Sequence, residues 1–460
     1  MSGGQEALHL IGGGDINDLT AEQLANLQKN LANNPALQEA LKNLGAISDE
    51  NYISAINEKI AKYNPEQALI VVADPNTGEI LGMSSRPNFD SNYYQKYDIN
   101  TINRNLPIWA TYEPGSTFKI ITLAASLEEK TINIFDDQYH DSGSIHVDSA
   151  RIKCWKKGGH GSQTFLNVVE NSCNPGFVVM GQKLGTKKLY KYITEFGFGK
   201  KTGIDLNGES SGILFKYDKI GPVEQATMSF GQGISVTPIQ QINGVSAAIN
   251  GGYLNTPFIV KYLSEPETNN IIKENKKNTV KQVISEETSK LVRYSLESVV
   301  ANGTGKNAYI ENYRVGGKTG TAQKVNNGIY MVGNYILSFI GFLPADKPEY
   351  IIYVAIDNPK GVTQYGGTVS APIAKNVMKN IIDLKNIKQD NSGMIRKEYT
   401  WLDTKYIMLP NVIGKNLKDA QKELKGFKIE YTGTGNKIIE QDPSSNQYVK
   451  EGSTIKLMLN

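Results

Sequence analysis

Residues 113–129 read EPGSTFKIITLAASLEE, a Pro-Gly turn followed by a continuous apolar stretch. We expect a helix from Ser116 to about Glu129. On a helix, residues three apart share a face, so the Ser116 hydroxyl and the Lys119 amine can meet. A free serine is a poor nucleophile and needs an adjacent base, which a lysine desolvated by apolar neighbours can supply. Taken alone, the Ser-x-x-Lys spacing is better explained as a solvated helix start.

A second short pattern, SCN at 172–174, precedes a Pro-Gly pair. Ser172 and Asn174 are two residues apart in what we expect to be a loop, so their side chains can project the same way. A hydroxyl in that place can relay a proton, and an amide can hold the amide of a substrate. On its own, this pattern is better explained as an ordinary loop.

The third pattern is VGGKTGTA at 315–322. Small residues on a strand let an extended substrate backbone lie alongside it. Lys318 can supply a positive charge for a carboxylate, and Thr319 and Thr321 offer hydroxyls and backbone donors. Another Lys-Thr-Gly, at 201–203, lies in a glycine-rich turn with no strand before it, so we do not take it as the active copy.

Hydrophobic periodicity predicts an α+β fold for the main part of the chain. A strand pair opens it, from Gln67 through a Pro-Asn-Thr-Gly turn to Met83. Helices are predicted over 116–129 and 165–184. Three antiparallel strands follow, and then a small α/β unit after a polar linker. The late strands are predicted at 313–323 with a glycine break, 334–342 and 350–356, and those of the small unit at 428–431, 437–441 and 454–459, with a helix at 417–424.

Composition excludes several classes of function. The 460 residues include 49 Lys and Arg against 46 Asp and Glu, a net charge of +3, which does not favour a nucleic-acid partner. Two cysteines exclude a disulfide-stapled scaffold. No apolar run approaches the ~18 residues of a membrane span, so we expect this chain to be soluble.

Residues 1–14 have the glycine clusters of an expression scar, and short helices are predicted from there to residue 63.

Taken together and in this order, the three patterns form the motif set of penicillin-interacting serine enzymes. From Gln67 to Leu384 the chain resembles class B penicillin-binding proteins, the monofunctional peptidoglycan transpeptidases, and the segment SFGQGISVTP at 229–238 adds to the resemblance. The last 52 residues resemble one PASTA domain. Sporulation-specific members from clostridia and bacilli are the most similar. The implied fold is an antiparallel sheet flanked by helices, as in serine β-lactamases, with a small C-terminal PASTA-like domain.

This resemblance implies four segments. They are a scar and helical spacer that replaces or truncates the family's pedestal (1–64), the transpeptidase domain (65–390), a linker (391–408) and the PASTA-like domain (409–460). It also implies a native protein anchored in a membrane and facing outward, in the intermembrane space of the spore for a sporulation member. The implied partners are peptidoglycan stem peptides, β-lactam antibiotics and a membrane glycosyltransferase.

The resemblance assigns roles to the motif residues. Ser116 is the implied acyl-enzyme nucleophile and Lys119 its general base, while Ser172 passes the proton to the leaving amine. Preorganised backbone donors stabilise an oxyanion by roughly 3–4 kcal/mol each. The remaining implied roles are the substrate amide on Asn174, the substrate carboxylate on Lys318 and Thr319, the oxyanion hole at the N–H groups of Ser116 and Thr321, and substrate binding at Gly320.

Both cysteines fall close to the second motif, and three of the four histidines fall in the same window. Zinc in a structural site takes four N, S or O ligands. We expect a structural zinc site, with a disulfide and two buried free thiols as the alternatives. The expected ligands are Asp141, Cys154, His160 and Cys173, with His140 as the rival of Asp141 for the fourth place.

Other activities were weighed against cross-linking. A β-lactamase needs a deacylating carboxylate, and we find no Glu-x-x-Leu-Asn segment to supply one. A D,D-carboxypeptidase and a β-lactam sensor or wall-binding protein without cross-linking are the remaining alternatives. They differ from a transpeptidase in what happens to the acyl group after Ser116 is acylated.

Overall fold

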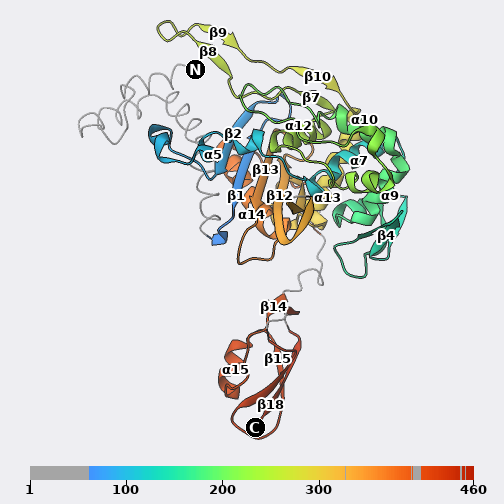
Figure 1. Cartoon of the computed structure of the whole chain (residues 1–460), viewed down its shortest axis with the longest axis vertical. Coiled ribbons are helices and arrows are strands. Elements are labelled where there is room, and N and C mark those ends of the chain that lie inside the picture. The colour runs from blue at the N-terminus through green and yellow to red at the C-terminus, as the bar shows by residue number, and fades with distance from the viewer. Residues whose placement is uncertain (1–61, 327, 395, 397–405, 446–447, 451) are drawn as a thin grey trace, which may run out of the picture. The chain divides into compact units, whose positions relative to one another are not determined.

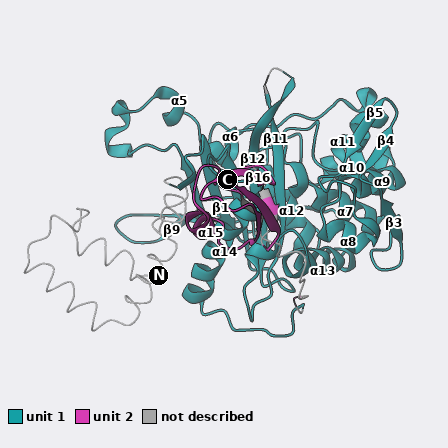
Figure 2. Ribbon diagram, turned by 90° about the horizontal axis from the view of Figure 1, so that it is seen from below, with its two compact units in different colours: residues 1–395 teal, residues 396–460 magenta. Residues whose placement is uncertain are grey.

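The computed structural model describes residues 62–326, 328–394, 396, 406–445, 448–450 and 452–460 (Figure 1). The helices predicted before residue 62 lie outside these residues. The chain divides into two units, residues 1–395 and 396–460, which are coloured separately in Figure 2 and are described one at a time. No helix among the described residues is long and apolar enough to cross a membrane.

The first unit is built on a five-stranded sheet in the order β11-β12-β13-β1-β2. Every neighbouring pair in it is antiparallel, with Gln67 opposite Asp357 and Lys318 opposite Ile340. The N-terminal strand pair therefore completes a sheet whose other strands come some 250 residues later, and β11 is an edge strand. The strands are β1 (Gln67–Ala73), β2 (Ile80–Arg86), β11 (Gly316–Asn326), β12 (Ile329–Leu343) and β13 (Tyr350–Asp357).

Strand β1 shows how the sheet is covered on both faces. After Gln67 its residues are apolar without alternation, and all of them are buried. Leu69 and Val71 belong to the core shared with helices α7 (Lys119–Glu128) and α12 (Pro238–Ile249), whereas Ile70 and Val72 belong to the core shared with helix α14 (Gly366–Lys385). A strand that is apolar on both faces is the expected signature of a sheet between two helical layers. The α+β prediction, with helices flanking an antiparallel sheet, is confirmed.

Helices form the rest of this unit, with short strand pairs between them (Figure 1). The helices are α5 (Ile99–Ile102), α6 (Leu106–Trp109), α7 (Lys119–Glu128), α8 (Phe165–Glu170), α9 (Asn174–Leu184), α10 (Thr186–Glu195), α11 (Pro222–Met228), α12 (Pro238–Ile249), α13 (Glu286–Asn302) and α14 (Gly366–Lys385). The short strands are β3 (Gln138–Asp141) with β6 (Gly161–Thr164), β4 (Ser144–Val147) with β5 (Ala150–Lys153), β7 (Tyr253–Asn255) with β10 (Thr279–Gln282), and β8 (Tyr262–Ser264) with β9 (Ile271–Glu274).

The single helix predicted over 165–184 is wrong. The chain forms α8 and α9, which are separated by residues 171–173. Ser172 has φ of +52°, a left-handed conformation that no helix interior contains. Pro175 lies in the first turn of α9, where its missing N–H leaves no hydrogen bond unmade.

The second unit contains a three-stranded sheet in the order β15-β18-β16, parallel in the first pair and antiparallel in the second. Leu409, Ala420 and Leu457 belong to its own buried core. The predicted helix and three strands are present, and β14 takes up the last three residues of the predicted linker. The elements are β14 (Tyr406–Met408), α15 (Leu417–Glu423), β15 (Lys428–Thr432), β16 (Ile438–Asp442), β17 (Tyr448–Lys450) and β18 (Thr454–Leu459).

Candidate active site

Ser116 lies in a 3₁₀ turn, Gly115–Thr117, directly before α7. Gly115 has φ of +54°, and its N–H donates to the carbonyl of Gly231 at 3.0 Å. A Cβ on Gly231 would lie 2.2 Å from the Gly115 oxygen, so only glycine allows this approach. The segment at 229–233, whose sequence carried part of the family resemblance, therefore supports the turn that presents the Ser116 hydroxyl.

The amine of Lys119 lies among the polar groups of the second motif. Its Nζ donates to Asn174 Oδ1 at 2.7 Å, to the Ser172 carbonyl at 2.9 Å and to Ser172 Oγ at 3.2 Å. The side chain is 1% exposed, and burial lowers the pKa of Lys119 from 10.5 to about 7. An amine with a pKa near neutrality can accept a proton at physiological pH, as a general base must.

Ser172 follows Asn171, the residue that caps the C-terminus of α8, and a left-handed residue in this place is usually glycine. A serine there costs of order 1 kcal/mol or more in backbone strain, which the surrounding contacts must offset. Two hydrogen bonds hold the turn, from the Ser172 N–H to the Val169 carbonyl and from the Cys173 N–H to the Val168 carbonyl. The strained conformation places the Ser172 hydroxyl beside the lysine amine.

Strand β11 runs alongside the serine turn. A Cβ on Gly115 would lie 3.1 Å from the Cβ of Ala322, and one on Gly320 would lie 3.1 Å from Thr117 Cγ2. The same Gly320 Cβ would lie 2.2 Å from Ser338 Oγ. The Lys-Thr-Gly-Thr segment and the Ser-x-x-Lys turn are therefore in van der Waals contact, with glycine required at the point of contact.

Lys318 and Thr319 are both buried beside this contact. The Lys318 amine donates to the Thr319 carbonyl at 3.2 Å, and burial together with the charge of Lys119 lowers its pKa. The Thr319 hydroxyl donates to Thr304 Oγ1 at 3.1 Å, and the Thr304 N–H donates to the Glu170 carbonyl at 3.0 Å. Thr304 thus connects the third motif to the helix that precedes the second.

Sequence reasoning missed Thr304, and it also missed Glu113. The Glu113 carboxylate accepts from the Gly233 N–H at 2.7 Å and from the Tyr330 hydroxyl at 3.1 Å. Burial raises the pKa of Glu113. The sequence did offer a signal for Glu113, because this residue opens the EPGSTFK stretch three residues before Ser116. It offered none for Thr304, because the surrounding Gly-Thr-Gly sequence resembles that of any turn.

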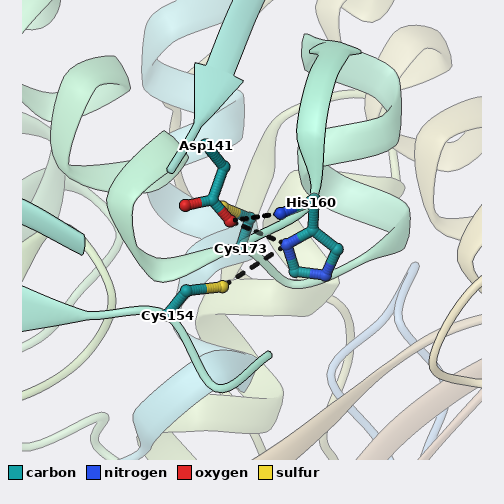
Figure 3. Close-up of side chains that lie close together, drawn as sticks. All are labelled: Asp141, Cys154, His160 and Cys173. Atoms are coloured by element: carbon teal, nitrogen blue, oxygen red, sulfur yellow. Dashed lines mark hydrogen bonds and ion pairs between the residues drawn. The ribbon is translucent and has the colours of Figure 1, made fainter. Parts of the chain in front are cut away.

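Four side chains next to the second motif form a cluster, shown in Figure 3. One potential ligand atom from each of Asp141, Cys154, His160 and Cys173 lies within 4.8 Å of all the others. Asp141 Oδ2 is 2.8 Å from His160 Nδ1 and 3.3 Å from Cys173 Sγ, and Cys154 Sγ is 3.4 Å from His160 Nδ1. Both cysteines are free thiols, so the structure contains no disulfide between them.

The rival fourth ligand, His140, points elsewhere. Successive residues of a strand face opposite sides, and in β3 the side chain of Asp141 is buried while that of His140 is exposed. His140 Nδ1 lies 3.0 Å from Ser162 Oγ, outside the cluster. His146 is also exposed.

The donors in this cluster are those that zinc takes, namely two sulfurs, one imidazole nitrogen and one carboxylate oxygen. Burial alone would raise the pKa of Asp141, but hydrogen bonds from Cys154 and His160 lower it to about 2. A hydrogen bond from Cys173 lowers the pKa of Cys154 to about 6. A carboxylate and a thiolate are thus favoured in one partly buried place. Burial alone would lower the pKa of His160, but its hydrogen bonds with Cys154 and Asp141 raise it, so either a protonated His160 or a bound cation would compensate their charge.

Residues 68–379 match the family described as the penicillin binding protein transpeptidase domain, and residues 407–460 match the PASTA domain. Stage V sporulation protein D of Bacillus subtilis is 57% identical over 399 residues, covering 87% of this chain and 62% of that protein. A peptidoglycan D,D-transpeptidase FtsI homolog of Mesostigma viride is 32% identical over 357 residues, covering 72% of this chain and 59% of the homolog.

Solved structures agree with the fold. The apo transpeptidase domain of Burkholderia pseudomallei penicillin-binding protein 3 superposes with a TM-score of 0.65 at 27% identity, covering 75% of this chain and 96% of that one. Penicillin-binding protein 3 of Mycobacterium tuberculosis, solved with aztreonam, gives a TM-score of 0.69 at 28% identity, covering 75% of this chain and 78% of that one.

Proposed function

The chain belongs to the penicillin-binding protein transpeptidase family, and on that premise we propose that it is a serine D,D-transpeptidase that cross-links peptidoglycan stem peptides. It spans about three-fifths of the length of the curated relatives it matches. The observation that carries the proposal is the position of Lys119, whose buried amine contacts both polar residues of the second motif while its helix begins beside Ser116.

In the first half-reaction, Lys119 accepts the proton of Ser116, whose oxygen attacks the carbonyl of the penultimate D-alanine. The oxyanion is stabilised by the N–H groups of Ser116 and Thr321, at roughly 3–4 kcal/mol for each donor. When the tetrahedral intermediate collapses, the C–N bond breaks and Ser172 passes a proton to the departing D-alanine amine. The product is an ester between Ser116 and the donor peptide.

In the second half-reaction, the amine of another stem peptide attacks this ester. Its proton returns through the same groups to the Ser116 oxygen, which leaves as the C–O bond breaks. Before the terminal D-alanine leaves, Lys318, Thr319, Gly320 and Thr321 take its carboxylate and the peptide backbone, while Asn174 holds the donor amide. A β-lactam carries an amide of similar shape and would acylate the same serine.

A stem-peptide thioester mimic and a labelled penicillin test the proposal. A transpeptidase forms a stable penicilloyl-enzyme and transfers the thioester's acyl group to an added D-amino acid. Transfer to water alone would show a carboxypeptidase, rapid penicillin release a β-lactamase, and acylation without transfer a sensor. Ser116→Ala should abolish labelling. Labelling that persists in this variant would refute the assignment of the nucleophile.

Zinc in the Asp141–Cys154–His160–Cys173 cluster is the finer part of this proposal. A bound zinc would serve as a structural ion that holds the second-motif loop, because Cys173 stands between Ser172 and Asn174. Support comes from the donor set and from the 4.8 Å span of its ligand atoms. Elemental analysis should find about one zinc per chain, and a chelator should lower both the melting temperature and the penicillin acylation rate.

Two neighbouring residues supply a matched control for this test. Asp141→Asn should lose the metal, while His140→Asn should retain it, since only Asp141 faces the cluster. A purified chain without metal, or one whose behaviour the chelator does not change, would refute the zinc proposal.

The name of the Bacillus relative places that protein in sporulation. For this chain, a role in spore cortex or cell-wall synthesis, a membrane-anchored native protein facing outward and a membrane glycosyltransferase partner are parts of the same proposal. A fluorescent penicillin applied to sporulating cells tests the location, because signal confined to vegetative septa would contradict it.

A further inference from the structure

Trp155 directly follows the cluster residue Cys154, and it is 52% exposed. Its orientation is nevertheless fixed. The indole N–H donates to the Asn171 carbonyl at 2.8 Å, and the ring meets that of His160 edge-on, with centroids 5.3 Å apart. A large aromatic side chain that is held in place yet remains half exposed is typical of a contact surface.

Tyr365 lies beside Trp155, with ring centroids 6.1 Å apart and ring planes at 45°. It directly precedes α14, and the N–H of the next residue, Gly366, donates to Thr321 Oγ1 at 3.1 Å. Burial raises the pKa of Tyr365 to about 12, so the hydroxyl stays protonated. The two rings therefore connect the backbone just before Ser172 with the Lys-Thr-Gly strand.

Another contact brings the same segment to the second motif. The Asn174 side-chain amide donates to the carbonyl of Lys153, the last residue of β5, at 3.4 Å. The segment 153–155 thus passes beside Asn174, contributes Cys154 to the cluster and places the indole next to Tyr365. In the reaction proposed above, the strand segment that includes Thr319 and Thr321 takes the terminal carboxylate and the peptide backbone, so we expect the rings to lie beside the C-terminal residue of the donor peptide.

We propose that Trp155, together with Tyr365, is a specificity-determining contact for the C-terminal residue of the donor peptide, and that it selects a side chain as small as the methyl of D-alanine. This inference rests on the proposed function. Apolar contact with two ring surfaces favours a methyl group, whereas a longer side chain must displace an indole that is held by Asn171 and His160.

Thioester mimics that differ only in the leaving group test this. Thioglycolate carries no methyl, D-2-mercaptopropionate carries one, and D-2-mercapto-4-methylpentanoate carries an isobutyl group. The wild type should prefer the methyl compound, and about tenfold discrimination against the isobutyl one is the scale of pocket contacts of this kind. Trp155→Ala should remove most of that discrimination, and Trp155→Phe should retain it.

Trp109 in α6 supplies the control, being an indole 40% exposed with the Arg104 guanidinium 4.5 Å from its ring centroid. Trp109→Ala should leave the preference unchanged. Penicillin labelling and the melting temperature report whether each variant is folded. A labelled, folded Trp155→Ala enzyme with the wild-type preference would overturn the inference.

A binding readout separates this inference from the proposed function. The chain has three tryptophans, at 109, 155 and 401, so changing Trp109 and Trp401 to Phe leaves Trp155 as the only emitter. In that background with Ser116→Ala, adding N-acyl-D-Ala-D-Ala should shift the emission. A shift without thioester transfer by the parent enzyme would refute the transpeptidase and keep the contact, while transfer without a shift would refute the contact alone.

Discussion

The pH dependence of serine acylation tests the role of Lys119 directly. Its side chain is 1% exposed, and burial lowers its pKa from 10.5 to about 7. With that pKa, about one-tenth of the amine is neutral at pH 6 and about nine-tenths at pH 8. If the neutral amine is the general base, the second-order rate constant for acylation should rise about tenfold between these values and then level off.

A fluorescent penicillin measured under pseudo-first-order conditions provides the assay. Lys119→Arg keeps a cation that does not deprotonate in proteins, so it should lose the rise together with most of the rate. Lys119→Met removes the amine and keeps the apolar stem. A flat wild-type profile between pH 6 and 8, or an arginine variant as fast as the wild type, would refute the reasoning.

The lowered pKa of Lys119 should also make the stability of the protein depend on pH. Because the folded pKa lies below the unfolded one, the unfolded state binds more protons between about pH 7 and 10.5, and the free energy of unfolding should rise with pH across that window. At 1.36 kcal/mol per pKa unit, the difference of 3.5 corresponds to about 5 kcal/mol. Below pH 7 that contribution is absent. Lys119→Met should reduce this rise in denaturant unfolding and leave the part that the buried Lys318 contributes.

Three further predictions follow from the site and the domains. Ser172→Gly should leave the melting temperature near the wild type, because glycine tolerates φ of +52°, while acyl transfer falls about a hundredfold or more with the loss of the hydroxyl. Gly320→Ala should cost about 1–3 kcal/mol in denaturant unfolding, since its Cβ would lie 2.2 Å from Ser338 Oγ; Ser338→Gly in the same chain should recover part of it, and no recovery would argue against this clash. Deleting residues 409–460 should leave penicillin acylation within about twofold of the wild type, because that unit has its own core; a larger loss would show a direct role.

The chemistry of the site was predictable because each motif is short and its spacing is local. The way in which the three motifs come together could not be predicted, because it depends on long-range packing. The contact between Gly320 and Thr117 joins residues about 200 positions apart, and the Thr304 hydroxyl reaches Thr319 only through the end of α13. In the Asp141–Cys154–His160–Cys173 cluster, adjacent Asp141 and His140 could be told apart only once a strand was known to place them on opposite faces.

The fold departs from sequence expectation where tertiary burial outweighs local propensity. No helix was predicted over 366–385, yet α14 runs through it. It begins with two glycines and contains Pro372, all of which disfavour a helix. Its Val369, Ile373 and Val377 fill the core on one face of the sheet, and this packing supplies what the local sequence lacks. The break at Ser172 is the reverse case, a strong helical pattern interrupted at a residue placed for chemistry.

The position of β11 at the outside of its sheet has a further consequence. Outermost strands carry unpaired backbone groups and invite self-association between copies of a protein. Here the serine turn packs against the strand at Gly320 and Ala322, and Lys318 and Thr319 are buried. We expect this packing to hinder the approach of a second folded sheet more than that of a single extended chain. Under the proposed function, the same packing would favour loose peptide ends as substrates.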